Sequence, residues 1–156
     1  MEQQITLHVN GHDYSTTVRT HHTLLQVLRD QFHLDGVRIG CGVGMCGACT
    51  VLLDGQPVSA CLSLAVMAEG KKITTIEGLS QDERLHPVQQ AYLDQAAFQC
   101  AYCTPGFILT TVALLAEYPD PDDETIRDYL AGNLCRCGSY INILEAVRQC
   151  RQPSRS

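Results

Sequence analysis

The chain has 156 residues, of which 45% are apolar, and a formal net charge of −6. This length permits one ordinary domain or two small ones, each with a buried core. An acidic balance and a pI near 5.4 argue against nucleic acid as a partner, because phosphate binding requires a basic face.

The sequence also bears on the compartment. No apolar run approaches the ~20 residues of a membrane span, and the segment from Met1 to Ile5 lacks the charged and apolar regions of a secretory signal. We therefore expect a cytoplasmic protein without a membrane span. Nine cysteines in a reducing compartment favour metal ligation over disulfides.

The first elements in the chain are predicted to be a β-hairpin and a helix. Ile5, Leu7 and Val9 alternate with polar residues, and the pair Asn10-Gly11 that follows favours a type I′ turn. Thr23 is expected to cap a helix running to about Phe32, which carries a broad apolar stripe.

A glycine-rich loop then begins a stretch with four cysteines in the pattern C-x4-C-x2-C-x11-C, namely Cys41, Cys46, Cys49 and Cys61. Three thiolates from one loop and a fourth from a neighbouring element are typical of a plant-type [2Fe–2S] cluster. The glycines let the loop wrap closely and leave amide N–H groups free to face the sulfurs. Structural zinc is the alternative, although it usually takes its thiolates in two short pairs.

The chain around this fourth cysteine again reads as β structure. A second hairpin is expected over residues 50–53 and 56–60 through Asp54-Gly55, followed by a helical turn over 62–68 and a strand over 72–76. Two hairpins, a crossing helix and a late strand resemble the β-grasp fold of plant-type ferredoxins. We expect this domain to span residues 1–77.

Beyond Glu77 the alternating pattern does not return, and helical signals replace it. Four helices are expected, at about 87–97, 104–117, from the acidic segment 120–124 to near Gly132, and 140–150. Short connections suggest a small bundle over residues 78–156.

The helical half carries a second set of four cysteines. Cys100 and Cys103 form C-x2-C before the second of these helices, and Cys135 and Cys137 form C-x-C before the fourth. Two antiparallel helices with their loops at one end would join the pairs into one four-thiolate site. Zinc competes more strongly here, because paired short spacings suit it.

The two cysteine patterns together are similar, over nearly the whole chain, to the iron–sulfur subunit of the molybdenum hydroxylases. This family includes enzymes of the xanthine dehydrogenase, aldehyde oxidoreductase and carbon monoxide dehydrogenase type. The flanking residues agree, in segments 40–51, 103–106 and 133–137 and at Gln99. The resemblance implies an α+β protein with a β-grasp [2Fe–2S] domain and a four-helix bundle that holds a second [2Fe–2S] cluster.

The resemblance also implies a role for the chain. It would pass electrons singly from molybdopterin on a large subunit, through both clusters, to FAD on a medium subunit or to another acceptor. Gln99 and Cys137 are the residues expected at the molybdopterin, and the bundle cluster would receive electrons first. No catalytic acid, base or nucleophile is expected on this chain, so it is enzymatic only within the assembly.

Several residues depart from the family pattern or lie outside it. Ala101 stands where the family usually has glycine, and Gly138-Ser139-Tyr140 replaces the common Thr-Gly-Tyr. Cys150 has no partner in either pattern and is expected to be an inert core thiol. Two other functions stay open at this point: a zinc-stapled assembly or scaffold module, and a free-standing ferredoxin.

Overall fold

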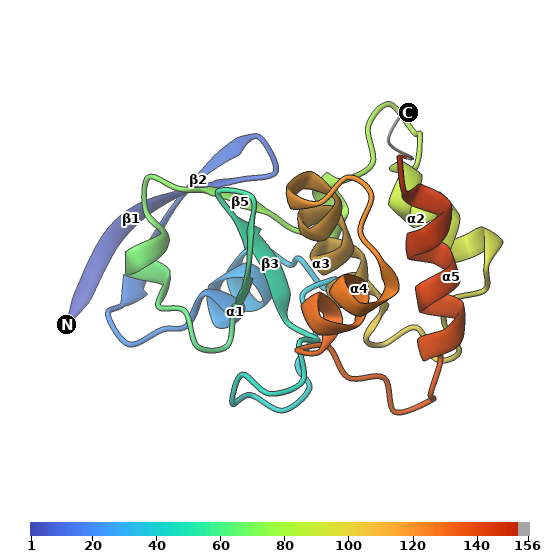
Figure 1. Cartoon of the computed structure of the whole chain (residues 1–156). Coiled ribbons are helices and arrows are strands. Elements are labelled where there is room, and N and C mark those ends of the chain that lie inside the picture. Colours follow the sequence, from blue (N-terminus) through green and yellow to red (C-terminus); the bar gives the residue numbers. More distant parts are fainter. Residues whose placement is uncertain (153–156) are drawn as a thin grey trace.

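The computed structural model describes residues 1–152. Its first half is a mixed five-stranded sheet in the order β2-β1-β5-β3-β4, and its second half is helical (Figure 1). The strands are β1 Glu2–Val9, β2 His12–Arg19, β3 Thr50–Leu53, β4 Gln56–Ser59 and β5 Lys72–Thr74. Strands β1 and β5 pair in parallel, and the other pairs are antiparallel.

Both predicted hairpins are present, and their turns have the expected backbone. Asn10 and Gly11 have φ of 52° and 82°, and Asp54 and Gly55 have φ of 51° and 82°. Positive φ at both central residues defines the type I′ turn, which matches the twist of the strands it joins.

The predicted crossing helix begins at its expected cap but is not uniform. The Thr23 hydroxyl accepts a hydrogen bond from the Gln26 N–H, and the Gln26 side chain accepts one from the Thr23 N–H. The α-helix α1 covers only Leu24–Gln26 and continues as a π-helical turn over Val27–Gln31. Leu24, Val27 and Leu28 are fully buried beneath the sheet, so the apolar stripe forms core as predicted.

Two predicted boundaries in this half were too wide. The helical turn expected over 62–68 is a 3₁₀ turn over Ala65–Ala68, and the strand expected over 72–76 ends at Thr74. The Thr75 N–H donates to the Asn10 side chain rather than to a strand, and a 3₁₀ turn over Ile76–Gly78 follows. Strand β5 therefore ends here, because the Asn10 side chain from the first hairpin turn takes the hydrogen bond of the next backbone N–H.

The helical half consists of α2 Pro87–Asp94, α3 Thr104–Glu117, α4 Asp123–Leu130 and α5 Tyr140–Cys150. Helix α2 ends three residues earlier than expected, and Ala96 beyond it has φ of 46°, which a helix cannot contain. The core of this half includes the largest side chains of α2 and α3, Tyr92 and Phe107. Arg148 of α5 forms an ion pair with Asp123 at the start of α4.

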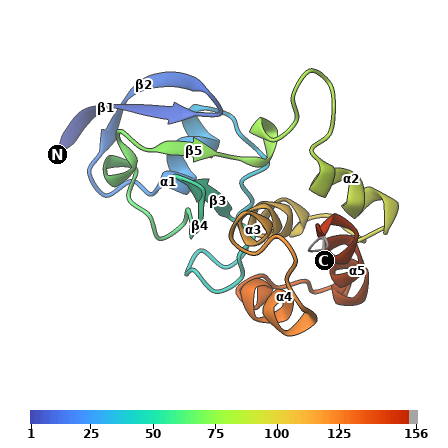
Figure 2. The same ribbon diagram turned by 45° about the horizontal axis from the view of Figure 1, so that its top comes forward.

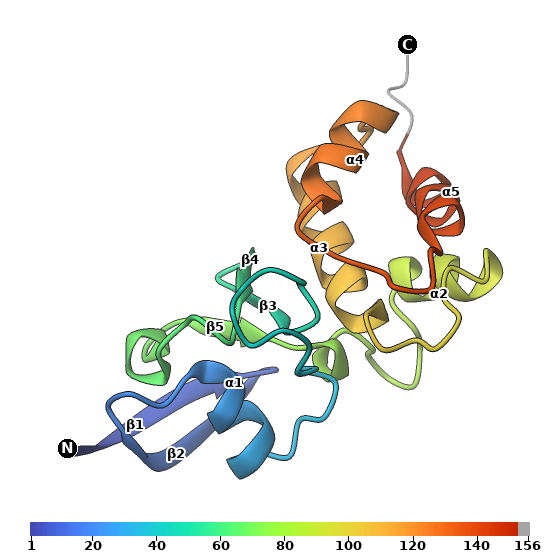
Figure 3. The same ribbon diagram turned by 90° about the horizontal axis from the view of Figure 1, so that it is seen from below.

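Helix α3 joins the two halves. Leu109 and Ala113 on α3 pack against Leu52 of β3 in a small core of their own. Figure 2, which looks nearly along α3, shows this helix between the sheet and α5. In the view from below, β1 begins at one end of the molecule and α5 lies at the other (Figure 3). Within residues 1–152, no helix has the length and apolar character needed to cross a bilayer.

Candidate metal centres

The first cysteine set lies in the loop that precedes β3 and just after β4. Backbone amides of this loop point at its sulfurs: Val43 N and Met45 N lie 3.4 and 3.2 Å from Cys41 Sγ, and Cys41 N lies 3.3 Å from Cys46 Sγ. Positive φ at Gly42, Gly44 and Gly47 gives the loop this curvature. The predicted close wrapping, with amides turned toward the thiols, is therefore present.

These thiols differ in their environments. The amides of Val43 and Met45 lower the pKa of the exposed Cys41 thiol to about 6. Burial raises the pKa of Cys49 to about 11, and its neighbour Cys61 is buried as well. One side of the set faces solvent and amide donors, and the other faces the core.

The second cysteine set lies where two loops of the helical half meet. Cys100 and Cys103 precede α3, Cys135 and Cys137 precede α5, and the sulfurs of Cys100 and Cys137 are 3.6 Å apart. A cavity of about 410 Å³ opens beside Cys100, Cys103 and Cys135. The Tyr102 amide lowers the pKa of the exposed Cys100 thiol, and burial raises that of Cys103 to about 12. This set thus repeats the arrangement of the first.

The arrangement of the thiols fits [2Fe–2S] clusters. The thiols contact each other two by two, as Cys41 with Cys46, Cys49 with Cys61, Cys100 with Cys137, and Cys103 with Cys135. Two thiolates on one tetrahedral metal with bonds of ~2.3 Å lie roughly 3.8 Å apart, close to the 3.6 Å found for Cys100 and Cys137. In residues 1–152 no three His, Cys, Asp or Glu side chains converge as ligands of one ion. A pair of thiols for each iron is the donor set that a [2Fe–2S] rhomb requires.

The two cysteine sets are held together by hydrogen bonds. Leu134 N donates to the Cys46 carbonyl at 2.9 Å, and the side-chain amide of the buried Asn133 donates to the Gly47 carbonyl at 3.2 Å. The approach is close enough that a Cβ on Gly106 would lie 2.2 Å from the Gly47 oxygen. A cysteine of the first set and the neighbour of a cysteine in the second are therefore directly hydrogen-bonded.

Tyr102, which lies between Cys100 and Cys103, makes a further link. Its hydroxyl donates to the Ile39 carbonyl at 2.7 Å, and Arg38 stacks on its ring at 5.5 Å. Sequence reasoning assigned no role to Asn133 or Tyr102, because the contact between the halves has no local sequence signal.

The residues predicted at the molybdopterin lie together. Gln99 is exposed in the loop after α2, and its side-chain amide donates to the Cys137 carbonyl at 3.2 Å. Ala101 has φ of 59°, a backbone conformation that glycine adopts without strain, which explains why glycine suits this position. Cys150 is half-buried against the helical core, and burial raises the pKa of its thiol.

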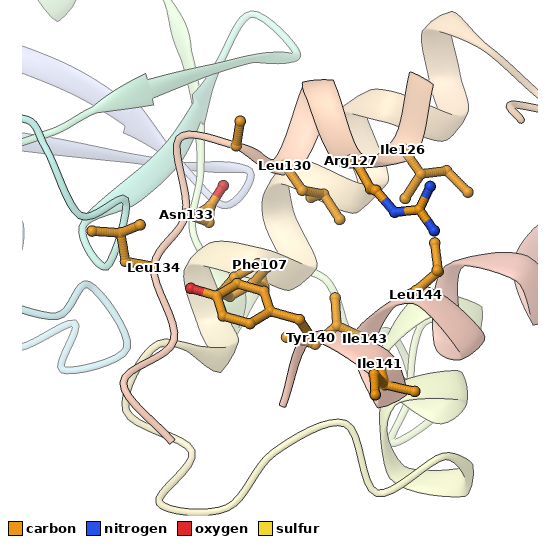
Figure 4. A pocket seen from close by; sticks show the side chains of 11 residues that line it. Phe107, Ile126, Arg127, Leu130, Asn133, Leu134, Tyr140, Ile141, Ile143 and Leu144 are labelled. Atoms are coloured by element: carbon orange, nitrogen blue, oxygen red, sulfur yellow. The ribbon is translucent and has the colours of Figure 1, made fainter. Parts of the chain in front are cut away.

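An apolar cavity of about 390 Å³ lies next to the second set, between α4 and α5 (Figure 4). Phe107 and Leu130 lie in its wall, and Arg127 lies at its α4 side. Leu134, Tyr140 and Ile141 border it and are 52, 47 and 76% exposed. Tyr140 also lines the cysteine cavity, and its hydroxyl accepts a hydrogen bond from Cys135 N at 2.8 Å.

Comparisons with known proteins agree with both halves. Residues 7–76 match the model of the 2Fe-2S iron-sulfur cluster binding domain, and residues 75–148 match that of the [2Fe-2S] binding domain. Fold and site thus define a protein with two [2Fe–2S]-binding parts.

Relatives of known function show to which family within this class the chain belongs. The chain is 45% identical to one of the subunits of nicotinate dehydrogenase from Pseudomonas putida, with 99% of each chain covered. It is 46% identical to the aldehyde oxidoreductase iron-sulfur-binding subunit PaoA of Escherichia coli, covering 92% of this chain and 69% of that one. The chain belongs to the family of iron–sulfur subunits of molybdenum hydroxylases, in which it serves electron transfer.

Solved structures have the same fold. Quinoline 2-oxidoreductase from Pseudomonas putida 86 superposes with a TM-score of 0.91 at 41% identity, covering 94% of this chain and 91% of that one. Aldehyde oxidoreductase from Desulfovibrio desulfuricans superposes with a TM-score of 0.89 at 42% identity. This chain covers 17% of that longer one, so the matched fold there is part of a much larger polypeptide.

Proposed function

We propose that Cys41, Cys46, Cys49 and Cys61 hold one [2Fe–2S] cluster and that Cys100, Cys103, Cys135 and Cys137 hold the other. The observation that carries this assignment is the two-by-two pairing of eight thiols in two places. We place the boundary between the two cluster-binding domains at residues 77 and 78, and describe the second domain as a four-helix bundle.

In this proposal electrons enter at the second site and leave from the first. Gln99 and Cys137 lie side by side on the exposed edge of the second site, where molybdopterin of a large subunit would approach. The Gln99 side chain has both a donor and an acceptor for the pterin. FAD on a medium subunit would receive electrons from the exposed side of the Cys41 loop.

The role of the chain itself would be to surround the two clusters, to fix the distance between them and to donate hydrogen bonds to their sulfur ligands. A [2Fe–2S] cluster takes up one electron at a time, so two of them divide a two-electron oxidation into single steps. The amides of Val43, Met45 and Ser139, which point at ligand sulfurs, stabilise the added negative charge. The hydrogen bond from Leu134 N to the Cys46 carbonyl gives a short through-backbone link from the first site to Cys135 of the second.

The apolar cavity between α4 and α5 is proposed to receive an apolar segment of the molybdenum-carrying polypeptide. Two observations favour this occupant. Tyr140 lines both this cavity and the second cysteine site, so the apolar surface is continuous with the edge where the pterin would bind. In the aldehyde oxidoreductase structure the matched fold is part of one longer chain, so this fold is joined to further protein there.

The experiment is to purify the tagged chain under native conditions and to measure molybdenum, iron and flavin in what accompanies it. Nicotinate, quinoline or a simple aldehyde is then added without oxygen, and the bleaching of the cluster absorption is followed. We expect a molybdenum-bearing large chain and cluster reduction by at least one of these compounds. A lone chain without a molybdenum-bearing partner would contradict the proposal and favour a free-standing ferredoxin.

The role of Gln99 is tested in the same assembly. Gln99→Ala should slow cluster reduction by the substrate while reduction by dithionite stays as fast as in the wild type. Gln90→Ala is the matched control, since Gln90 is an exposed glutamine of α2 whose side chain donates to Asp94. Equal rates for the Gln99 variant and the control would contradict contact with the pterin.

A further inference from the structure

Ser139 occupies the N-cap of α5, but its side chain does not cap the helix. A serine at this position normally accepts a hydrogen bond from an N–H of the first turn. Its backbone carbonyl does accept from Ile143 N at 3.0 Å, so the residue caps α5 with its main chain alone. The hydroxyl is therefore available for another partner.

The Ser139 hydroxyl has no hydrogen-bond partner among the described residues. Ser139 is 7% exposed, and its Oγ is one of few buried side-chain oxygens in residues 1–152 without a hydrogen bond. Leaving a buried hydroxyl unpaired costs free energy, so an unpaired buried hydroxyl indicates a missing partner.

A neighbouring cysteine sulfur is a candidate for that partner. Ser139 N donates to Cys135 Sγ at 3.4 Å, which places the backbone of Ser139 beside this sulfur. The cysteine thiol itself is a weak acceptor, whereas a metal-bound thiolate is a good one.

We propose that the Ser139 hydroxyl donates a hydrogen bond to the Cys135 thiolate when the second site holds its cluster, and thereby raises the reduction potential of that cluster. On reduction one electron enters the cluster and Ser139 keeps its proton. A donor to a ligand sulfur stabilises the extra negative charge of the reduced form more than the oxidised form. The inference rests on the proposed ligand set and adds a residue that favours electron entry at this site.

The test is an EPR-monitored redox titration of the full chain carrying both clusters. In Ser139→Ala the ratio of oxidised to reduced second cluster at a fixed potential should rise about three- to tenfold, as expected for one lost hydrogen bond. A tenfold change corresponds to ~59 mV for a one-electron couple. The first cluster serves as an internal reference and should not shift. Ser139→Thr keeps the hydroxyl and should restore the wild-type value.

Further variants and a spectroscopic readout separate a hydrogen bond from a packing effect. Ser139→Gly should behave as Ser139→Ala does, and it replaces that variant if the alanine chain does not retain its second cluster. Ser63→Ala is the matched control, because the Ser63 hydroxyl donates to the Ser59 carbonyl rather than to sulfur. After exchange into D₂O, pulsed EPR should detect a deuteron coupled to the second cluster that is lost in the Ser139→Ala and Ser139→Gly chains.

The outcomes are distinguishable from failure of the proposed function. If the reduced wild-type chain gives two cluster signals and removal of the hydroxyl shifts neither, the role of Ser139 is wrong and the ligand assignment stands. If both potentials shift equally, the effect is not local and the inference is likewise contradicted. Absence of any second-cluster signal in the wild-type chain would contradict the ligand assignment itself.

Discussion

At the scale of single residues, Ala101 has a strained backbone conformation next to a candidate metal site. It lies next to Cys100, is exposed, and has φ of 59°, a conformation that is strained for a residue with a Cβ. Ala101→Gly should therefore stabilise the cluster-loaded chain by about 1 kcal/mol, which raises its Tm by roughly 2–4 °C. Thermal melting followed by circular dichroism measures the change.

The control for this prediction is Ala116→Gly, since Ala116 is an exposed residue inside α3. Ala116 lies in the last turn of α3, and glycine is a poorer helix former than alanine by up to about 1 kcal/mol, so this variant should melt at a lower temperature than the wild type. If both variants lowered the Tm, the strain attributed to Ala101 would be wrong.

The ligand assignment makes a second prediction at the residue scale. Cys135→Ser should remove the second cluster alone and leave the first, because the thiols of the first set pair among themselves. Iron analysis and EPR should then detect about half the iron and one signal instead of two. Cys150→Ser is the matched control and should keep both clusters, since Cys150 packs against the helical core and the Pro87 carbonyl. Loss of iron in the control would contradict the assignment.

Individual residues also show what sequence can reveal about a site. The cysteine spacings predict both sets as cluster ligands, because ligand spacing along a loop is a local property. The hydrogen bond from the Gln99 side chain to the Cys137 carbonyl joins residues that are 38 positions apart in the chain. The pattern of residue types along the chain does not encode such contacts.

Among the elements, the contact between α3 and the first cysteine loop is a tight constraint. Gly106→Ala would bring a Cβ within 2.2 Å of the Gly47 carbonyl oxygen, and backbone on both sides leaves little room to move. Alanine favours a helix over glycine, yet the clash should dominate and destabilise the chain by about 1–3 kcal/mol. The Tm should fall by several degrees.

Gly132→Ala is the corresponding control, because a Cβ there would meet no atom of the described residues within 4 Å. Its effect should stay within about 0.5 kcal/mol. The same melting experiment compares the two variants. Equal melting temperatures would show that α3 and the first cysteine loop are not in the tight contact described.

Sequence predicted the type of each element better than its ends. Both hairpins, the Thr23 cap and the helices α3 and α5 are confirmed, because periodicity, turn pairs and caps are local signals. The wrong boundaries lie where a distant group intervenes, as Asn10 does at Thr75. The π-helical turn over Val27–Gln31 likewise has no sequence signature of its own.

At the scale of the whole molecule, the apolar cavity between α4 and α5 predicts where the partner binds. Ile141→Asp places a charge on a side chain that is 76% exposed here and would be buried in the assembly. Both clusters should be retained, but the molybdenum-bearing chain should no longer co-purify, because an unpaired charge is costly to bury. Co-purification of the tagged variant measures the loss.

Met67→Asp is the control for this surface. Met67 is 70% exposed and lies in the turn Ala65–Ala68 on the sheet half. Its variant should associate as the wild type does. Equal association of both variants would show that the cavity faces solvent in the assembly.

The architecture of the molecule also bears on substrate choice. Relatives named for nicotinate, aldehyde and caffeine oxidation are 43–47% identical to this chain, so one electron-transfer fold accompanies enzymes for different substrates. We infer that substrate specificity resides outside this chain. The order of its two halves was predictable from the cysteine patterns, whereas the joining role of α3 depends on contacts between the halves.

The most direct test of the account is quantitative EPR with iron and sulfide analysis on the full chain, isolated without oxygen and reduced with dithionite. The account predicts about four iron and four sulfide per chain, two for each cluster, and two distinct signals that together approach two spins. Stoichiometric zinc with no signal, or a single signal with half that iron, would contradict it.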